Sequence, residues 1–126
     1  MKLNPDCIRD ILLLIEDQPF EQLLQFNDLQ TQLNDYTYEE LTYTCLKLNE
    51  AGLIKAVIAN FDNHIHVEFI QDLTFSGHEF LNNIQSDNVW NQTKDVLSKI
   101  GATSVNSITF IANQVIAALI KKIMNI

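Results

Sequence analysis

The sequence has few of the residues that break a chain or cross-link it. Its 126 residues include only 3 glycines, 2 prolines and 2 cysteines. So few chain breakers exclude a collagen-like chain, a disordered chain and a turn-rich barrel, whereas 47% apolar residues are enough for a packed core. The 3 glycines are also too few for a glycine-rich phosphate loop. We therefore expect one small, helix-rich globular protein.

The two cysteines, Cys7 and Cys45, lie far apart in apolar surroundings. This placement favours buried, inert thiols in a reducing compartment over a disulfide. The first residues mix charges and include a proline, where a secretion signal would have a basic start and an apolar run. Both features predict a cytoplasmic protein.

Basic side chains are scarce, since 8 lysines and arginines stand against 16 aspartates and glutamates, for a formal charge of −8. The imbalance is marked in residues 1–52, which contain 3 basic and 10 acidic side chains. Affinity for duplex DNA comes largely from cationic side chains that neutralise phosphates. The charge therefore argues against nucleic acid as a partner of this chain alone.

The first predicted helix covers about residues 5–17. Asn4 can cap its first turn, and Pro5 fits the first helical position, where the N–H that proline lacks would have no helical partner. A second, two-turn helix is expected to open at Asn27 and Asp28.

Thr37 and Glu40 form the pattern of a capping box, which predicts a third helix that ends at Ala51 and is stopped by Gly52. A connection of about three residues joins the second and third helices. Two helices with so short a connection are typical of a helix-turn-helix.

From Leu53 to Ile70 the apolar side chains recur every second residue, which is the period of a strand. Turn-forming side chains at 60–63 interrupt the pattern and predict a β-hairpin. One face of its second strand is expected to carry Ile65, Val67 and Phe69, and the other His64, His66 and Glu68. A helix-turn-helix followed directly by a hairpin is the element order of a winged helix.

The rest of the chain is predicted to be helical. A helix begins at Thr74 or Ser76, a continuation reaches Ile100, and a last helix covers about 104–124. The predicted fold is mainly α with a small β-hairpin. It consists of a winged helix-turn-helix domain, residues 1–86, and a C-terminal helical extension, residues 87–126.

Several segments also carry a specific residue pattern. Residues 73–81, LTFSGHEFL, precede a Val-Trp-Asn segment and follow LNEAGLI at 48–54. With residues 1–14, they resemble an uncharacterised domain-of-unknown-function family of small proteins of bacteria, phages and prophages. The resemblance covers residues 1 to about 100 and implies a winged-helix fold and a phage or prophage setting, but no activity. Its motif residues are Gly77, His78, Phe80, Leu81 and Trp90.

The outward face of the third helix decides which partner suits this protein. A helical projection with Leu41 inward also turns Tyr38, Cys45 and Leu48 inward. The outward face then carries Glu39, Glu40, Tyr43, Lys47 and Glu50. We predict a non-enzymatic regulatory or accessory protein, of phage or prophage type, that binds a protein partner through this face. The alternative is a DNA-binding transcriptional regulator of the winged-helix class.

The last predicted helix is the most apolar part of the chain and about 30 Å long, more than a small three-helix core can cover. We therefore predict a homodimer. Its contact residues are Ile108, Phe110, Val115, Leu119 and Ile123. Packing within the chain and binding to a membrane surface are the alternatives, while the polar side chains of this helix argue against a membrane span.

No set of residues points to catalysis. His64, His66 and Glu68 could approach a metal ion, but solvated hairpin side chains are the preferred interpretation. His78 has no serine or cysteine that it could activate. Trp90 is interpreted as an anchor between helices, in preference to an exposed contact for a partner. We expect no enzymatic activity, no metal and no cofactor.

Overall fold

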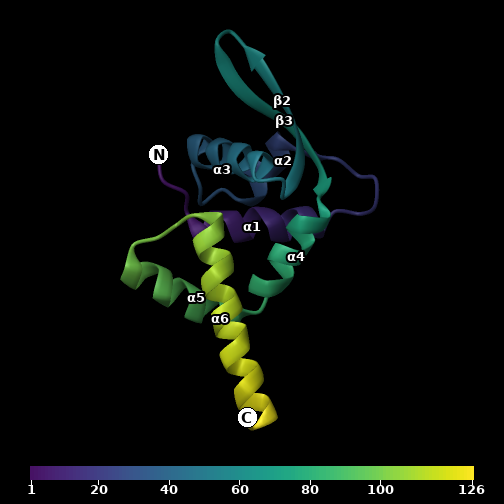
Figure 1. Ribbon diagram of the computed structural model, residues 1–126. Coiled ribbons are helices and arrows are strands. Elements are labelled where there is room, and N and C mark those ends of the chain that lie inside the picture. Colours follow the sequence, from purple (N-terminus) through teal and green to yellow (C-terminus); the bar gives the residue numbers. More distant parts are fainter.

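The computed structural model describes all residues, 1–126, as a mainly helical protein with a small antiparallel sheet (Figure 1). A hairpin projects from one end of the molecule, and the last helix projects from the other (Figure 1). The elements in chain order are α1 (Pro5–Glu16), β1 (Leu24–Gln25), α2 (Phe26–Gln32), α3 (Tyr38–Glu50), β2 (Ile54–Phe61), β3 (His64–Leu73), α4 (Phe75–Ile84), α5 (Asp87–Ile100) and α6 (Val105–Met124).

The predicted starts of α1 and α3 are confirmed. The side chain of Asn4 accepts a hydrogen bond from the backbone N–H of Asp6 (3.0 Å). The hydroxyl of Thr37 accepts one from the N–H of Glu40 (3.1 Å). These bonds satisfy amide groups that have no partner inside their helix, so the local sequence determines where each helix begins.

The predicted hairpin is confirmed as β2 and β3, which pair antiparallel. Its turn is shorter than expected, because only Asp62 and Asn63 lie between the strands. Both residues have positive φ angles, 51° and 63°. That backbone is typical of a two-residue hairpin turn and suits asparagine and aspartate.

A third strand joins the sheet at its other edge. Leu24 and Gln25 of β1 pair with Ile70 and Phe69 of β3, which gives the strand order β1-β3-β2. The sequence did not indicate this pairing. A strand of two residues has too short a pattern to reveal its partner.

Side chains also cap the three C-terminal helices. Thr74 accepts a hydrogen bond from the N–H of Gly77 (3.0 Å), so α4 begins there and the competing start at Ser76 is not used. Ser86 caps α5, and Ser104 caps α6. Caps at these positions make three separate helices out of the last 52 residues.

One hydrophobic core contains side chains from both predicted parts of the chain. The residues that α5 and α6 contribute to it include Trp90, Leu97, Ile108 and Ala112. They belong to the same core as apolar side chains of α1, α3, α4 and the sheet, and α4 is the neighbour that both helices contact. Residues 1–86 and 87–126 therefore form one packed body, and the boundary between them coincides with the cap of α5.

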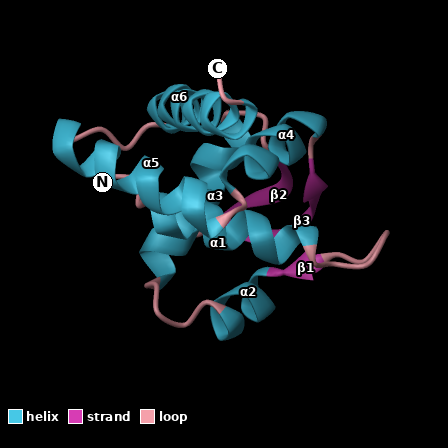
Figure 2. Cartoon of the chain, turned by 90° about the horizontal axis from the view of Figure 1, so that it is seen from below, coloured by secondary structure: helices cyan, strands magenta, loops and turns pink.

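Only the first half of α6 belongs to this core. Ile108, Ile111 and Ala112 are buried, whereas Ile123 is 79% exposed and Met124 is 61% exposed. Figure 2, which looks along α6, shows α4 and α5 on one side of the helix and no element on the other. The second half of α6 is thus an apolar helix without a neighbour in its own chain.

By length and composition, α6 could cross a membrane. An 18-residue window has a mean hydropathy of 1.4, and 17% of it is buried. The core contacts of its first half would have to break before the whole helix could enter a bilayer. The absence of a membrane span, which was inferred from the polar side chains, stays a prediction.

Replacing Thr42 with valine is expected to stabilise the protein by about 1 kcal/mol. The Oγ1 atom of Thr42 is buried without a hydrogen-bond partner. Valine has nearly the same shape and removes the unsatisfied hydroxyl. Urea unfolding followed by circular dichroism measures the change.

The matched control is Thr44→Val on the same helix. Thr44 is also buried, but its hydroxyl donates to the carbonyl oxygen of Glu40 (2.7 Å). This substitution removes a hydrogen bond and should be neutral or destabilising by about 1 kcal/mol. If Thr42→Val lowers the free energy of unfolding as much as Thr44→Val does, the hydroxyl of Thr42 makes a hydrogen bond in the folded protein.

Candidate protein-binding surface

The exposed side of α3 carries Glu39, Tyr43, Lys47 and Glu50, which we call the acidic face. Glu39 and Glu50 are exposed, and Tyr43 and Lys47 are half-buried. The side chain of Glu39 makes no hydrogen bond or ion pair within the chain. Four of the five residues predicted for partner binding therefore lie together on one side of the helix.

The single amine of this face is already neutralised. The Nζ atom of Lys47 lies 3.1 Å from Oε2 of Glu50 and 5.5 Å from the centre of the Tyr43 ring. The hydrogen bond to Glu50 and its charge raise the pKa of Lys47 above the usual value. The acidic face thus presents no free cation to a phosphate group.

Glu40 differs from the sequence-based prediction, which placed it on the outward face. It is half-buried, and its Oε2 atom accepts a hydrogen bond from Nδ2 of Asn4 (3.2 Å). The reason is that the chain segment before α1 lies along this side of α3. Glu40 connects the two helices and is not part of the acidic face.

Tyr38 also differs, since it was predicted to point inward and is 40% exposed. Its ring meets the edge of Phe26 at 5.6 Å, and its hydroxyl lies 3.0 Å from Nδ1 of His66. His66 belongs to β3, so this contact shows that the β2–β3 hairpin lies next to the start of α3. Tyr38 therefore connects the start of α3 to the hairpin.

The tip of the hairpin is apolar as well as acidic. Phe61 is 68% exposed and Ile65 is 48% exposed, beside the turn at Asp62. Ile65 was predicted to share a face with Val67, but the strands extend past the core, so burial on β3 begins at Val67 and continues at Ile70 and Leu73. Sequence alternation indicated the two faces of the strand, but it could not indicate where the core ends.

The histidines of the hairpin lie side by side, with the rings of His64 and His66 6.5 Å apart. No group of three or more histidine, cysteine, aspartate or glutamate side chains in the chain is arranged to hold a metal ion. His66 instead contacts the hydroxyl of Tyr38.

Both thiols are buried and unpaired, as the sequence predicted. Burial raises the pKa of the Cys7 thiol to about 11 and that of the Cys45 thiol to about 12. A thiol must ionise before it can attack an electrophile. Cys7 and Cys45 therefore serve as apolar core residues at neutral pH.

Four of the five family-motif residues pack inside the protein. Phe80, Leu81 and Trp90 are core residues, and a Cβ atom at Gly77 would collide with the backbone carbonyl of Leu53. Only His78 is exposed, and its side chain makes no hydrogen bond within the chain, although its backbone N–H donates to the carbonyl oxygen of Thr74. The motif thus mainly records how α4 and α5 pack against the rest of the protein.

Trp90 acts as the predicted anchor between helices. Its Nε1–H donates to Oδ1 of Asp6 on α1 (2.9 Å). Arg9 and Lys94 lie over its ring at 5.7 and 5.9 Å. Lys94 belongs to the same helix, but the sequence did not indicate Asp6 and Arg9, because α1 lies more than 80 residues earlier in the chain.

The predicted oligomerisation residues on α6 divide into three groups. Ile108 is fully buried in its own chain, so it cannot contact a second copy, and the prediction for this residue is wrong. Val115 and Leu119 are half-buried. Phe110 and Ile123 are 66% and 79% exposed. Available contacts therefore lie toward the C-terminal end and on the side of Phe110.

Comparison with known proteins places the sequence in a family without an assigned function. The family model described as hypothetical protein (DUF2513) matches residues 2–104. An uncharacterized protein of Haemophilus influenzae (strain ATCC 51907 / DSM 11121 / KW20 / Rd) is 32% identical over 121 residues, which cover 95% of this chain and 99% of that relative. No solved structure matches the chain. The resemblance to an uncharacterised domain family is therefore confirmed, and the chain belongs to the DUF2513 family.

Proposed function

We propose that this chain is a winged-helix protein that binds a basic surface of another protein with α3 and the β2–β3 hairpin. The element order α1-β1-α2-α3-β2-β3 and the strand order β1-β3-β2 support the winged-helix assignment. In this assignment α3 is the recognition helix and the hairpin is the wing. The role is regulatory or accessory, without catalysis, in the cytoplasm.

The observation that carries the proposal is the charge of the acidic face. Glu39 has no partner, and Glu50 neutralises Lys47. The phosphates of duplex DNA would be repelled by the carboxylates of this face, because DNA binding requires cationic side chains. A basic protein surface would be attracted to the same carboxylates. The phage or prophage setting rests only on the residue pattern of the motif and belongs to the proposal.

Aromatic side chains next to the acidic face supply contacts for such a partner. Tyr38 at the start of α3 and Phe61 at the hairpin tip are exposed, and Tyr43 is the half-buried aromatic residue of the acidic face itself. Protein interfaces are enriched in tyrosine and phenylalanine, and a few such side chains contribute most of the binding energy. Charge would then guide the approach of the partner, while these rings would hold it.

The test compares the wild type with the variant Glu39→Lys/Glu50→Lys. The wild type should give no gel shift with duplex DNA at low salt, and it should capture a basic protein from lysate of cells that carry the gene. The variant should lose that capture by at least about tenfold, because charge guides the encounter.

The control variant Asp17→Lys/Glu21→Lys makes the same change in net charge in the loop after α1, where both residues are exposed. It should still capture the partner. A salt-sensitive gel shift by the wild type would instead favour the DNA-binding regulator, which the element order alone would also allow.

A further inference from the structure

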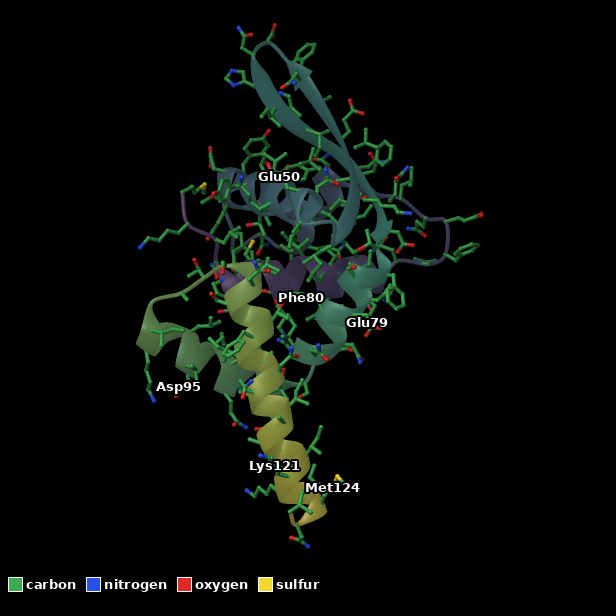
Figure 3. All side chains as sticks on the ribbon, in the orientation of Figure 1. Glu50, Glu79, Phe80, Asp95, Lys121 and Met124 are labelled. Carbon is green, nitrogen blue, oxygen red and sulfur yellow. The ribbon has the colours of Figure 1, made fainter.

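We propose that a second copy of this chain covers the exposed side of α6 in an antiparallel homodimer. The inference does not depend on the acidic face, which lies at the other end of the molecule: Figure 3 shows Glu50 far from Lys121 and Met124. It concerns the side of α6 that faces away from the core, where the one side-chain hydrogen bond to the rest of the chain joins Nδ2 of Asn83 to Oδ1 of Asn113 (3.5 Å).

This side, which we call the open face, is a stripe of exposed residues at helical spacing. It contains Phe110, Asn113, Ala117, Ile120 and Met124, which follow one another at steps of three, four, three and four residues. That spacing keeps a stripe straight along two helices that pack lengthwise. At about 1.5 Å per residue, Phe110 and Met124 lie about 21 Å apart.

A shallow apolar groove widens the open face at its N-terminal end. Val96 and Ile100 of α5 are 37% and 61% exposed, and they lie beside Phe110 with Ile111 at the base. Monomeric proteins rarely expose large continuous apolar patches, and a specific interface buries about 800 Å² per chain. The groove and the open face together give one apolar surface along α5 and α6.

The charges of the two halves of the molecule favour a second copy as the occupant. Residues 105–126 contain Lys121 and Lys122 and no acidic side chain, whereas residues 1–104 contain 6 basic and all 16 acidic ones. The projecting end of α6 is therefore cationic, and the body from which it projects is anionic. The end of one copy complements the body of another.

Charge also selects the antiparallel direction. A parallel pair would bring Lys121 and Lys122 of both copies together, four like charges at one end of the dimer. An antiparallel pair that crosses at Ala117 would separate them and place each cationic end against the acidic body of the partner. Phe110 of one chain would then face Met124 of the other, and the small Ala117 side chains would allow close approach.

The first experiment measures mass by light scattering during gel filtration. The wild type should have twice its monomer mass of 14.4 kDa. Ala117→Arg, which places a long cationic side chain at the crossing point, should halve the measured mass. The control Gln32→Arg, on the exposed side of α2, should stay dimeric. A monomeric wild type, or a dimeric Ala117→Arg variant, would overturn the proposal.

The second experiment tests direction by cysteine cross-linking with a mild oxidant. Both native thiols are buried and give little background. Phe110→Cys and Met124→Cys should each fail to cross-link alone, since equivalent positions would lie about 21 Å apart. Mixed together after exchange of subunits, they should form a disulfide-linked dimer. Cross-linking of either variant alone would contradict the antiparallel arrangement.

A membrane is the competing occupant, and a third measurement separates it from a second copy. The wild type should remain in solution when vesicles of phosphatidylcholine and phosphatidylglycerol are sedimented. Binding to these vesicles by a protein that is monomeric in solution would assign α6 to the membrane surface and overturn the dimer.

Discussion

Replacing Gly77 with alanine is expected to lower the free energy of unfolding by about 3 kcal/mol or more. A Cβ atom at this position would overlap the backbone carbonyl oxygen of Leu53 and also meet its carbonyl carbon and Cα. A flexible side chain could move away, but backbone cannot do so without separating α4 from the segment between α3 and β2. The gain of about 1 kcal/mol from the higher helix propensity of alanine is too small to compensate. Urea or thermal unfolding measures the loss.

Gly52→Ala is the matched control, because Gly52 lies next to Leu53 and faces a different restriction. Its φ is +74°, and no atom lies within 4 Å of an added Cβ. Only backbone strain of about 1 to 2 kcal/mol opposes alanine there. If Gly77→Ala and Gly52→Ala lower the free energy of unfolding equally, the close contact between Gly77 and Leu53 is not the reason for a glycine in the motif.

The contrast between these glycines shows what the sequence can and cannot indicate. Gly52 follows an apolar helical pattern, and a glycine in that place predicts a helix end. The caps at Asn4, Thr37 and Ser104 were predictable for the same reason, since each bond joins residues at most three apart. Gly77 lies inside the first turn of α4. A glycine is required there because the backbone of Leu53, 24 positions earlier, lies against it.

The candidate protein-binding surface follows the same rule. Helical spacing identified Glu39, Tyr43 and Glu50 as outward residues, because a regular helix determines their directions. It failed for Glu40 and Tyr38, whose surroundings depend on Asn4 and on the hairpin. A projection around one helix shows which side chains share a face, but not which neighbouring element lies against that face.

The same limit explains the mixed outcome on α6. Its apolar stripe predicted a buried face, and the first half of that stripe is buried at Ile108 and Ala112. The stripe continues at Ile123, where α4 and α5 have already ended and the side chain is 79% exposed. The apolar periodicity indicated a helix face that packs against other apolar side chains. It could not indicate whether those side chains belong to the same chain or to another molecule.

Trp90→Ala is expected to cost about 3 to 5 kcal/mol of unfolding free energy. Trp90 is 2% exposed and is the largest fully buried side chain. Its removal would leave a cavity between α1 and α5, and the carboxylate of Asp6 would lose the hydrogen bond that the indole donates. Of the substitutions considered for stability, this one should have the largest effect, and urea unfolding measures it.

Trp90→Phe separates the hydrogen bond from the packing. Phenylalanine keeps an aromatic ring but cannot donate to Asp6, so the loss should be smaller, about 1 to 2 kcal/mol for the hydrogen bond.

Burial raises the pKa of Asp6, but the hydrogen bonds from Trp90 and Lys94 more than offset it, so the pKa lies below its ordinary 3.8. A carboxyl whose pKa is lowered by folding stabilises the protein above its ordinary pKa and loses that contribution as the pH falls through the lowered value. The stability difference between wild type and Trp90→Phe should therefore be largest near neutral pH and shrink below about pH 4. A difference that stays constant down to pH 2 would mean that Trp90 contributes only by packing.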